Sequence, residues 1–184
     1  MNLDLEPQTD FNVSADLYSA TALVIRPHNR YVIECFDSEG KPRWREEVDN
    51  LIPDAGANDL LTQYLKGVSY SANWYLGIID AAGFTGLNNT DTPASHPGWV
   101  EAQYYTQPTR PALVLGTAAA RSISNSASPA VFSINGTGNV NGAFIATSAN
   151  KADPTGVLYG EASFPIARSV LSGDTLNVSV TLTA

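Results

Sequence analysis

The C-terminal end of the chain carries the clearest alternation of apolar and polar positions. Across residues 175–183, Leu176, Val178, Val180 and Leu182 alternate with Thr, Asn and Ser residues. Successive side chains of a β-strand point to opposite faces of the sheet, so this pattern predicts a strand with one buried face and one solvated face.

Short apolar runs separated by Gly, Pro, Asn and Ser occupy most of the remaining chain and predict further strands. These runs cover residues 21–26, 31–36, 42–48, 74–79, 99–105, 112–115, 130–134, 142–147, 156–159 and 163–168. We expect the first two runs to form a hairpin with a turn at 27–29, and the third, which is more polar, to lie at a sheet edge. The Ser- and Ala-rich residues 118–129 are expected to form a long loop.

Strands spaced about 10 to 15 residues apart, with turn-forming residues between them, are typical of antiparallel architectures and not of βαβ units. The predicted fold class is mostly β: an antiparallel, jelly-roll-like β-sandwich with one short α-helix and an extended N-terminal arm. Residues 1–20 are assigned to the arm and residues 21–184 to a single sandwich domain, because a chain of 184 residues can bury one core without covalent cross-links.

The helix is predicted over residues 54–66, with Asp54 as its N-cap and Gly67 as the residue that ends it. Apolar residues at helical spacing form a stripe, and the opposite face is polar. The stripe consists of Leu60, Leu61, Tyr64 and Leu65. We expect the helix to lie across a sheet or to close one end of the sandwich.

The first 20 residues combine acidic side chains with scattered apolar ones and show no sustained period. Two interpretations remain open for this segment: a disordered terminus, or an extended segment that lies along a neighbouring protein or along its own domain. The apolar residues favour docking and are candidate interface residues. They are Leu3, Leu5, Phe11, Val13 and Leu17.

Charge restricts the possible partners. Ten Lys and Arg against eighteen Asp and Glu give a net charge of −8, which opposes attraction to phosphate backbones and anionic lipids. We therefore expect neither a direct nucleic-acid partner nor a membrane partner. The first residues lack the basic and apolar regions of a secretory signal, so synthesis in a cytoplasm is expected.

Reactive residues are few and scattered. Cys35 lies in an apolar run and is interpreted as a small buried side chain, and the two histidines, His28 and His96, suggest neither a nucleophile–base pair nor a metal ligand set. No catalytic residue, metal or cofactor is predicted, and the chain is not expected to be an enzyme. Three carboxylates near strand ends leave glycoside cleavage open, although solvated acids are the favoured interpretation. They are Asp80, Glu101 and Glu161.

Five aromatic residues could form a sugar-stacking platform or an anchor for another protein. They are Trp74, Tyr75, Trp99, Tyr104 and Tyr105. Trp74 lies in an apolar run and is expected to pack in the core. Trp99 follows the rigid turn at 95–98 and is the better surface candidate, so Trp99, Tyr104 and Tyr105 join the candidate interface residues.

A set of packing and turn motifs runs from residue 44 to residue 182. It comprises Trp44 with Glu46 or Glu47, Gly56-Ala-Asn58, Trp74-Tyr-Leu-Gly77, Asp91-Thr-Pro-Ala-Ser-His-Pro-Gly-Trp99, Arg110, Ser124-Asn-Ser126, Phe132-Ser-Ile134, Gly142-Ala-Phe144, Gly156-Val-Leu-Tyr159 and Gly173-Asp-Thr-Leu176. This set resembles small virion structural proteins of tailed bacteriophages, and most of all capsid decoration or cement proteins. The motifs are not catalytic signatures, so the resemblance carries over no site residue.

The resemblance implies a homo-oligomeric decoration protein that binds the major capsid protein or other virion proteins, located in the virion after synthesis in the bacterial cytoplasm. An alternative function is a tail- or fibre-associated module that binds carbohydrate or a receptor, motivated by Trp99, Tyr104 and Tyr105. A third, an enzyme acting on cell-wall glycan, depends on whether the three carboxylates converge.

Overall fold

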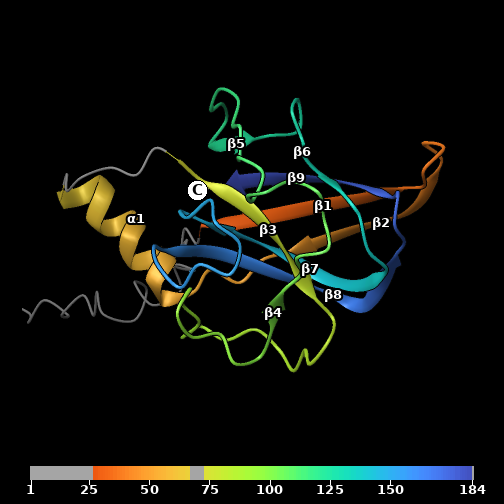
Figure 1. Cartoon of the computed structure of the whole chain (residues 1–184). Coiled ribbons are helices and arrows are strands. Elements are labelled where there is room, and N and C mark those ends of the chain that lie inside the picture. Colours follow the sequence, from red (N-terminus) through yellow and green to blue (C-terminus); the bar gives the residue numbers. More distant parts are fainter. Residues whose placement is uncertain (1–26, 67–72, 184) are drawn as a thin grey trace, which may run out of the picture.

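The computed structural model describes residues 27–66 and 73–183, with the side chains of residues 64–66 left out of the description. One helix and nine strands occur in this part of the chain (Figure 1). In chain order they are β1 (His28–Phe36), β2 (Pro42–Asp49), α1 (Asp54–Lys66), β3 (Tyr75–Asp80), β4 (Val100–Glu101), β5 (Ser122–Ser124), β6 (Ala130–Ser133), β7 (Gly138–Ala146), β8 (Leu158–Val170) and β9 (Thr175–Thr183).

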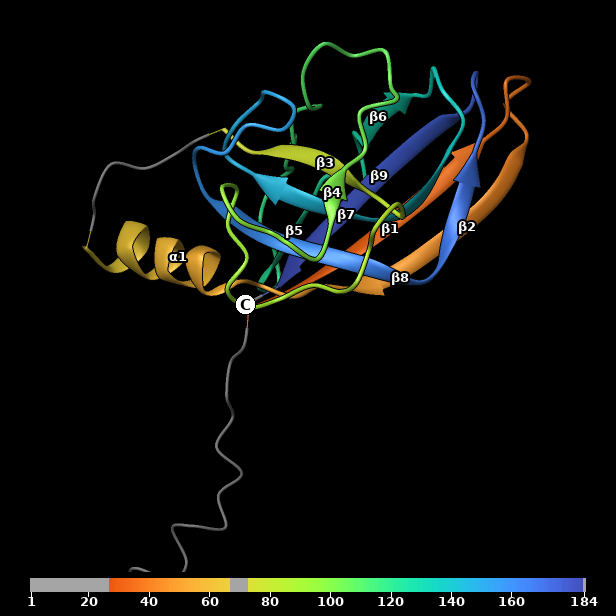
Figure 2. The same cartoon turned by 60° about the horizontal axis from the view of Figure 1, so that its bottom comes forward.

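The strands form two antiparallel sheets. Sheet A has the order β2-β1-β9-β5, with β6 also paired to β9, and sheet B has the order β4-β3-β7-β8. The two sheets pack against each other, and α1 lies at one end of them (Figure 2). The predicted mostly β class with one short helix is confirmed, and β2 is an edge strand as predicted.

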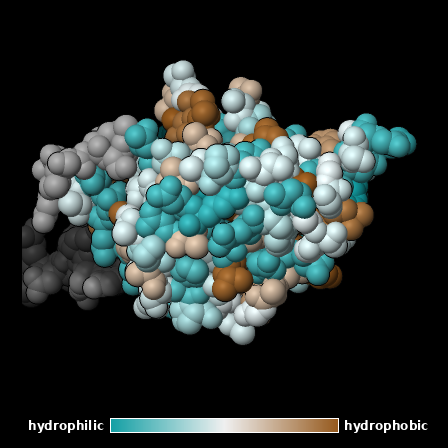
Figure 3. Space-filling view, in the orientation of Figure 1, coloured by the Kyte–Doolittle hydropathy of each residue, from teal (hydrophilic) through white to brown (hydrophobic). Residues whose placement is uncertain are grey.

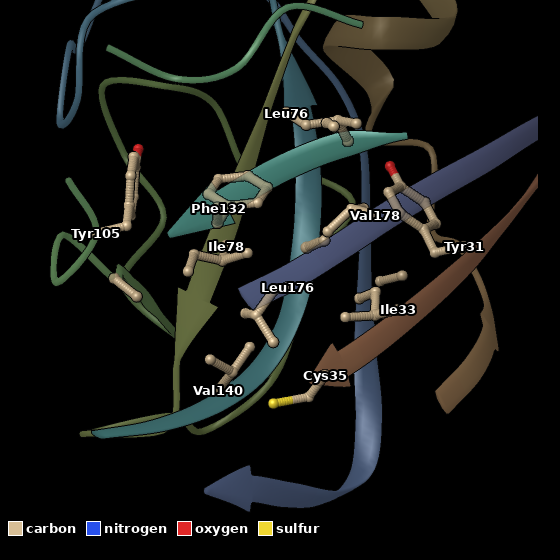
Figure 4. Packing of buried hydrophobic residues seen from close by; sticks show 14 of the residues in the cluster. Tyr31, Ile33, Cys35, Leu76, Ile78, Tyr105, Phe132, Val140, Leu176 and Val178 are labelled. Atoms are coloured by element: carbon tan, nitrogen blue, oxygen red, sulfur yellow. The ribbon is translucent and has the colours of Figure 1, made fainter. Parts of the chain in front are cut away.

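A shared core fills the space between the sheets. Apolar side chains of β1, β6 and β9 from sheet A meet those of β3, β7 and β8 from sheet B (Figure 4). The alternation predicted for β9 is confirmed, because Leu176, Val178 and Val180 are fully buried. Burying side chains of this size contributes roughly 1.5–3 kcal/mol each, so this core is the main source of stability.

A second apolar cluster lies on the other face of sheet B. Ile78 belongs to the shared core, whereas the next residue, Ile79, packs with Trp99 and Phe144. Successive strand residues point to opposite faces, so the second cluster lies outside the sandwich. It is covered by residues 81–99, the β3–β4 loop, which ends with Trp99.

The two sheets are joined along the edge formed by β2 and β8. Trp44 of β2 packs edge-on against Phe164 of β8, with ring centroids 5.9 Å apart, and its indole Nε1–H donates to the Ser169 carbonyl at 3.0 Å. Beyond the end of β2, Leu51 and Glu161 exchange two backbone hydrogen bonds of 2.7 and 2.9 Å. These contacts hold the two sheets together along this side of the sandwich.

Helix α1 has the predicted bounds and lies at one end of the two sheets, and the two leucines of its predicted apolar stripe whose side chains are described are partly exposed. The helix approaches the backbone of β8 most closely at Gly56, where a Cβ atom would lie 2.4 Å from the Tyr159 carbonyl oxygen. Leu60 and Leu61 are 39% and 54% exposed. The helix therefore lies at one end of the sandwich without burying these two leucines fully, and the predicted helix end at Gly67 lies outside the described residues.

Four of the predicted strand and loop boundaries are wrong. The turn predicted at 27–29 overlaps β1, whose pairing with β9 extends back to His28. The run at 99–105 contributes only the two residues of β4, and 112–115 forms no strand but a single bridge to β3. The predicted loop 118–129 contains β5, which adds to the edge of β9.

The runs at 156–159 and 163–168 belong to one 13-residue strand, β8. The residues between the two runs include Glu161 and were not predicted to form a strand. They are part of β8 because each of them pairs with a residue of the neighbouring β7. Cross-strand pairing therefore overrides the local signal.

The predicted arm at 1–20, with its candidate interface residues, lies outside the described residues, as does the run at 21–26. Within the described ranges, no helix is long and apolar enough to cross a membrane.

Candidate functional site

The three carboxylates considered for glycoside cleavage do not converge. Glu101 lies on β4 and Glu161 on β8, which are the two edges of sheet B, with β3 and β7 between them. Asp80 ends β3, and its Oδ1 accepts a hydrogen bond from the Ala82 N–H at 2.8 Å. Glu101 is the cross-strand partner of Ile79, so Asp80, the next residue, points to the opposite face of sheet B, and the arrangement does not provide the two carboxyls facing one cleft that a glycosidase requires.

Glu101 is part of a buried ion pair with Arg110. Arg110 Nε and Nη2 donate to the two carboxylate oxygens at 2.9 and 2.8 Å, and the side chains are 3% and 4% exposed. Arg110 also donates to the Ser148 carbonyl at 2.9 Å, and the Ala152 N–H donates to Glu101. The pair therefore fastens the β7–β8 connection to the segment that follows β4.

The two histidines occupy unrelated positions. His28 Nε2 lies 3.2 Å from an Asp49 carboxylate oxygen on the exposed surface of sheet A. The His96 ring stacks on Trp99 with centroids 3.9 Å apart, and its Nδ1 lies 2.8 Å from the Trp99 carbonyl oxygen. Among the residues that the structure describes, no group of three or more His, Cys, Asp or Glu side chains is placed to hold a metal ion.

Cys35 is fully buried in the shared core, as predicted from its apolar run. Burial, followed by the charge of Asp174, raises the pKa of the thiol to about 12. A reactive cysteine requires a thiolate, so this environment makes Cys35 inert in the folded chain.

We expect Cys35 to resist modification by a thiol-specific reagent near neutral pH and to react fully once the chain is unfolded in urea. Burial keeps the reagent away from the sulfur atom, and the raised pKa keeps the thiol protonated. Spectrophotometric counting of reacted thiols in native and denaturing buffer measures this. Rapid labelling under native conditions would contradict the position of Cys35 in the core.

The predicted surface aromatics are mostly buried. Trp99 is 3% and Tyr105 2% exposed, so the expectation that Trp99 lies on the surface is wrong, and neither ring is exposed for stacking on a ligand. Tyr104 is half-buried and donates its hydroxyl to the Asn139 carbonyl at 3.0 Å. Trp74, predicted to be a core residue, packs against the core but is only partly buried.

The main accessible hollow lies at the end of the sandwich next to α1. We call it the end groove, and it has two adjoining parts of about 190 and 510 Å³ that share Leu60, Tyr159 and Leu182. The smaller part is lined by Asp59, Leu60, Gln63, Trp74, Leu113, Leu115, Ile145, Tyr159 and Leu182. The larger part is lined by Pro27, Leu60, residues 118–123, Tyr159, Leu182 and Thr183.

The end groove has an aromatic floor and a few polar groups. The rings of Trp74 and Tyr159 lie 5.3 Å apart between centroids. Gln63 donates to Asp59 at 3.2 Å, and its buried Oε1 has no hydrogen-bond partner within the described ranges. Burial, followed by the charge of Asp59, raises the pKa of Tyr159. A largely apolar surface with a few polar groups suits the binding of an apolar segment or a flat ring.

Two further exposed apolar residues are sequence neighbours of residues that line the end groove. Leu61 lies one residue after the groove residue Leu60 on α1, and Val114 lies between the groove residues Leu113 and Leu115 and is 56% exposed. In the view of Figure 3, hydrophobic side chains gather above β5, over the loop that precedes it, while much of the visible face is hydrophilic. The leucine stripe of α1 and Trp74 were the sequence signals for this surface. Tyr159, Leu182 and Gln63 were missed.

Comparison of the chain with protein-family models and with curated proteins finds no match.

Proposed function

We propose that this chain is a non-enzymatic structural protein of a bacteriophage virion, of the capsid decoration or cement kind, that binds a neighbouring virion protein through the end groove. The observation that carries the binding role is the pair of exposed leucines on α1 beside an apolar hollow. The virion assignment depends on the resemblance of the motifs between residues 44 and 182. The proposal includes a jelly-roll-like arrangement of the sandwich and an N-terminal arm.

The energetics of such a role are favourable. Covering one exposed leucine contributes roughly 1.5–3 kcal/mol, so a partner that covers the end groove gains a moderate affinity from a few side chains. Many copies on a symmetric shell then gain from multivalency, and no single contact needs to be tight. The net charge of −8 reduces attraction of the free protein to packaged nucleic acid.

The test is the variant Leu60→Asp, which places a charge at a leucine that lines both parts of the end groove. We expect the variant to fold, because Leu60 is 39% exposed, and to load at least about tenfold less onto shells of the parent phage that lack this protein. Co-sedimentation with the shells followed by quantitative mass spectrometry measures the loading.

The matched control is Ile166→Asp, which makes the same change at a 68% exposed apolar residue of β8 that does not line the end groove. This control is expected to load like the wild type. Equal loading of both variants would remove the end groove from the proposal, and purified parent particles without this chain would refute the virion role.

A second candidate function is supported by the floor of the end groove. Partly exposed Trp74 and Tyr159, next to Asp59 and Gln63, combine aromatic faces with planar polar groups, a combination that suits a sugar ring. A tail or fibre module would use it to bind surface polysaccharide of the host. Few copies per particle, together with a change in tryptophan fluorescence on adding that polysaccharide, would favour this function over decoration.

A further inference from the structure

Two buried carboxyl groups meet beneath the β3–β4 loop, away from the end groove. Glu161 pairs with Phe144 across β7 and β8, so its side chain emerges on the face of sheet B that carries the second apolar cluster. Asp91 reaches the same place from the loop, because it accepts a hydrogen bond from the Trp99 indole, which packs on Phe144, and its carboxyl lies within hydrogen-bonding reach of Glu161. Glu161 is 0% and Asp91 1% exposed, and two charges in such a position are strongly disfavoured unless a counter-charge or a proton is present.

The two carboxyls have different hydrogen-bond environments. Asp91 Oδ2 accepts from the Asn88 backbone N–H at 3.0 Å and from the Trp99 indole Nε1–H at 3.2 Å. The Trp99 indole N–H and the Asn88 N–H also lie near Glu161, but neither of its oxygens accepts a well-aligned hydrogen bond from a donor in the described part of the chain. Donated hydrogen bonds stabilise Asp91 as an anion, and Glu161 is therefore the group that holds a proton.

The groups that face Glu161 provide no positive charge. Asp91 approaches from the loop, Tyr31 from β1, and the apolar ring of Phe144 lies beside it on β7. His96 lies against Trp99 as part of the loop. Neither carboxyl takes part in an ion pair among the described residues. Burial, followed by the charge of Asp91, raises the pKa of Glu161 to about 8.

We propose that Asp91 and Glu161 share one proton and that this proton holds the β3–β4 loop on sheet B. While the proton is present, the pair carries one negative charge, and the protonated carboxyl donates a hydrogen bond to the ionised one. When the proton leaves to water, two like charges remain in a buried site and repel each other. The β3–β4 loop therefore acts as a pH-sensitive latch: it is held on sheet B at neutral pH and loosens in alkaline solution.

The sign of the pH dependence follows from linkage. In the unfolded chain Glu161 has an ordinary pKa near 4.5, whereas in the folded chain the pKa is about 8. The folded state keeps its proton over this range while the unfolded state releases it. The contribution of the Glu161 proton to the free energy of unfolding is therefore complete below about pH 4.5 and is lost as the pH rises to about 8.

Thermal unfolding of the full chain and of Glu161→Gln between about pH 5 and pH 8.5 tests the latch, because Gln mimics the protonated acid at every pH. We expect the variant and the wild type to have similar Tm values at the acidic end. At the alkaline end the variant should melt roughly 5–10 °C higher. The matched control Glu39→Gln, an exposed glutamate, should follow the wild type throughout.

Hydrogen exchange at the Asn88 amide measures opening of the loop directly, since this amide donates a hydrogen bond to Asp91. Its protection factor should fall about tenfold or more in the wild type at alkaline pH and persist in Glu161→Gln. If Glu161→Gln fails to fold, Asp91→Asn provides the same test, because it removes the like charge and keeps an acceptor for Asn88.

Two outcomes would overturn the latch. The first is a Tm difference between variant and wild type that stays constant across the pH range. The second is a rise in the wild-type Tm on adding Ca²⁺ or Mg²⁺ at alkaline pH that Glu161→Gln lacks, because a cation and not a proton would then neutralise the pair.

Discussion

Replacing Arg110 with Met should lower the free energy of unfolding by about 3 to 5 kcal/mol. Met retains an apolar stem but loses the guanidinium group that lies over the Phe144 ring, and it leaves the carboxylate of Glu101 buried without its counter-charge. The remaining donor to Glu101, the Ala152 N–H, cannot offset the loss of two charge-assisted hydrogen bonds. Urea unfolding followed by tryptophan fluorescence measures the change.

The double variant Glu101→Leu with Arg110→Met is the control for this prediction. Removing both charges avoids the unpaired carboxylate, so the double variant should regain at least half of the stability that Arg110→Met loses. The recovery is incomplete, because the Ser148 carbonyl and the Ala152 N–H also lose their partners. A loss below about 1 kcal/mol in the single variant would mean that solvent reaches Glu101 and that the ion pair is not buried.

The elements predicted best are those whose signals are local. The bounds predicted for β9 and α1 agree with the structure, since the period-two alternation of β9 and the cap and stripe of α1 are written in consecutive residues. The elements predicted worst depend on distant partners. β8 runs through Glu161 because β7 pairs across it, and the run after Trp99 is short because only two of its residues pair with β3.

The end groove was only partly predictable from sequence. The leucine stripe of α1 was visible, but the direction in which it points is set by Gly56 packing on the backbone of Tyr159, a contact between residues about a hundred positions apart. The sequence contains no local signal for such a contact. The same applies to Asp91, which in the sequence is one residue of a turn motif and in the structure is buried against β8 by the folding of the whole β3–β4 loop.

Replacing Trp99 with Ala should lower the free energy of unfolding by about 3 to 5 kcal/mol. The indole is 3% exposed, stacks on His96 and packs against Phe144 with ring centroids 5.0 Å apart, so its removal leaves a large cavity under the β3–β4 loop. It also removes one of the two donors to Asp91. Urea unfolding measures the loss, and limited proteolysis within the loop should become faster because the loop loses its anchor.

Trp99→Phe separates packing from hydrogen bonding at this position. Phe keeps much of the apolar volume and contact with Phe144 but lacks the Nε1–H, so it should recover roughly half of the loss while leaving Asp91 with the Asn88 N–H as donor. If Trp99→Ala costs less than about 1 kcal/mol, the second apolar cluster does not hold the loop. The opposite pattern, in which Phe is as damaging as Ala, would make the hydrogen bond to Asp91 the main anchor and the stacked rings secondary.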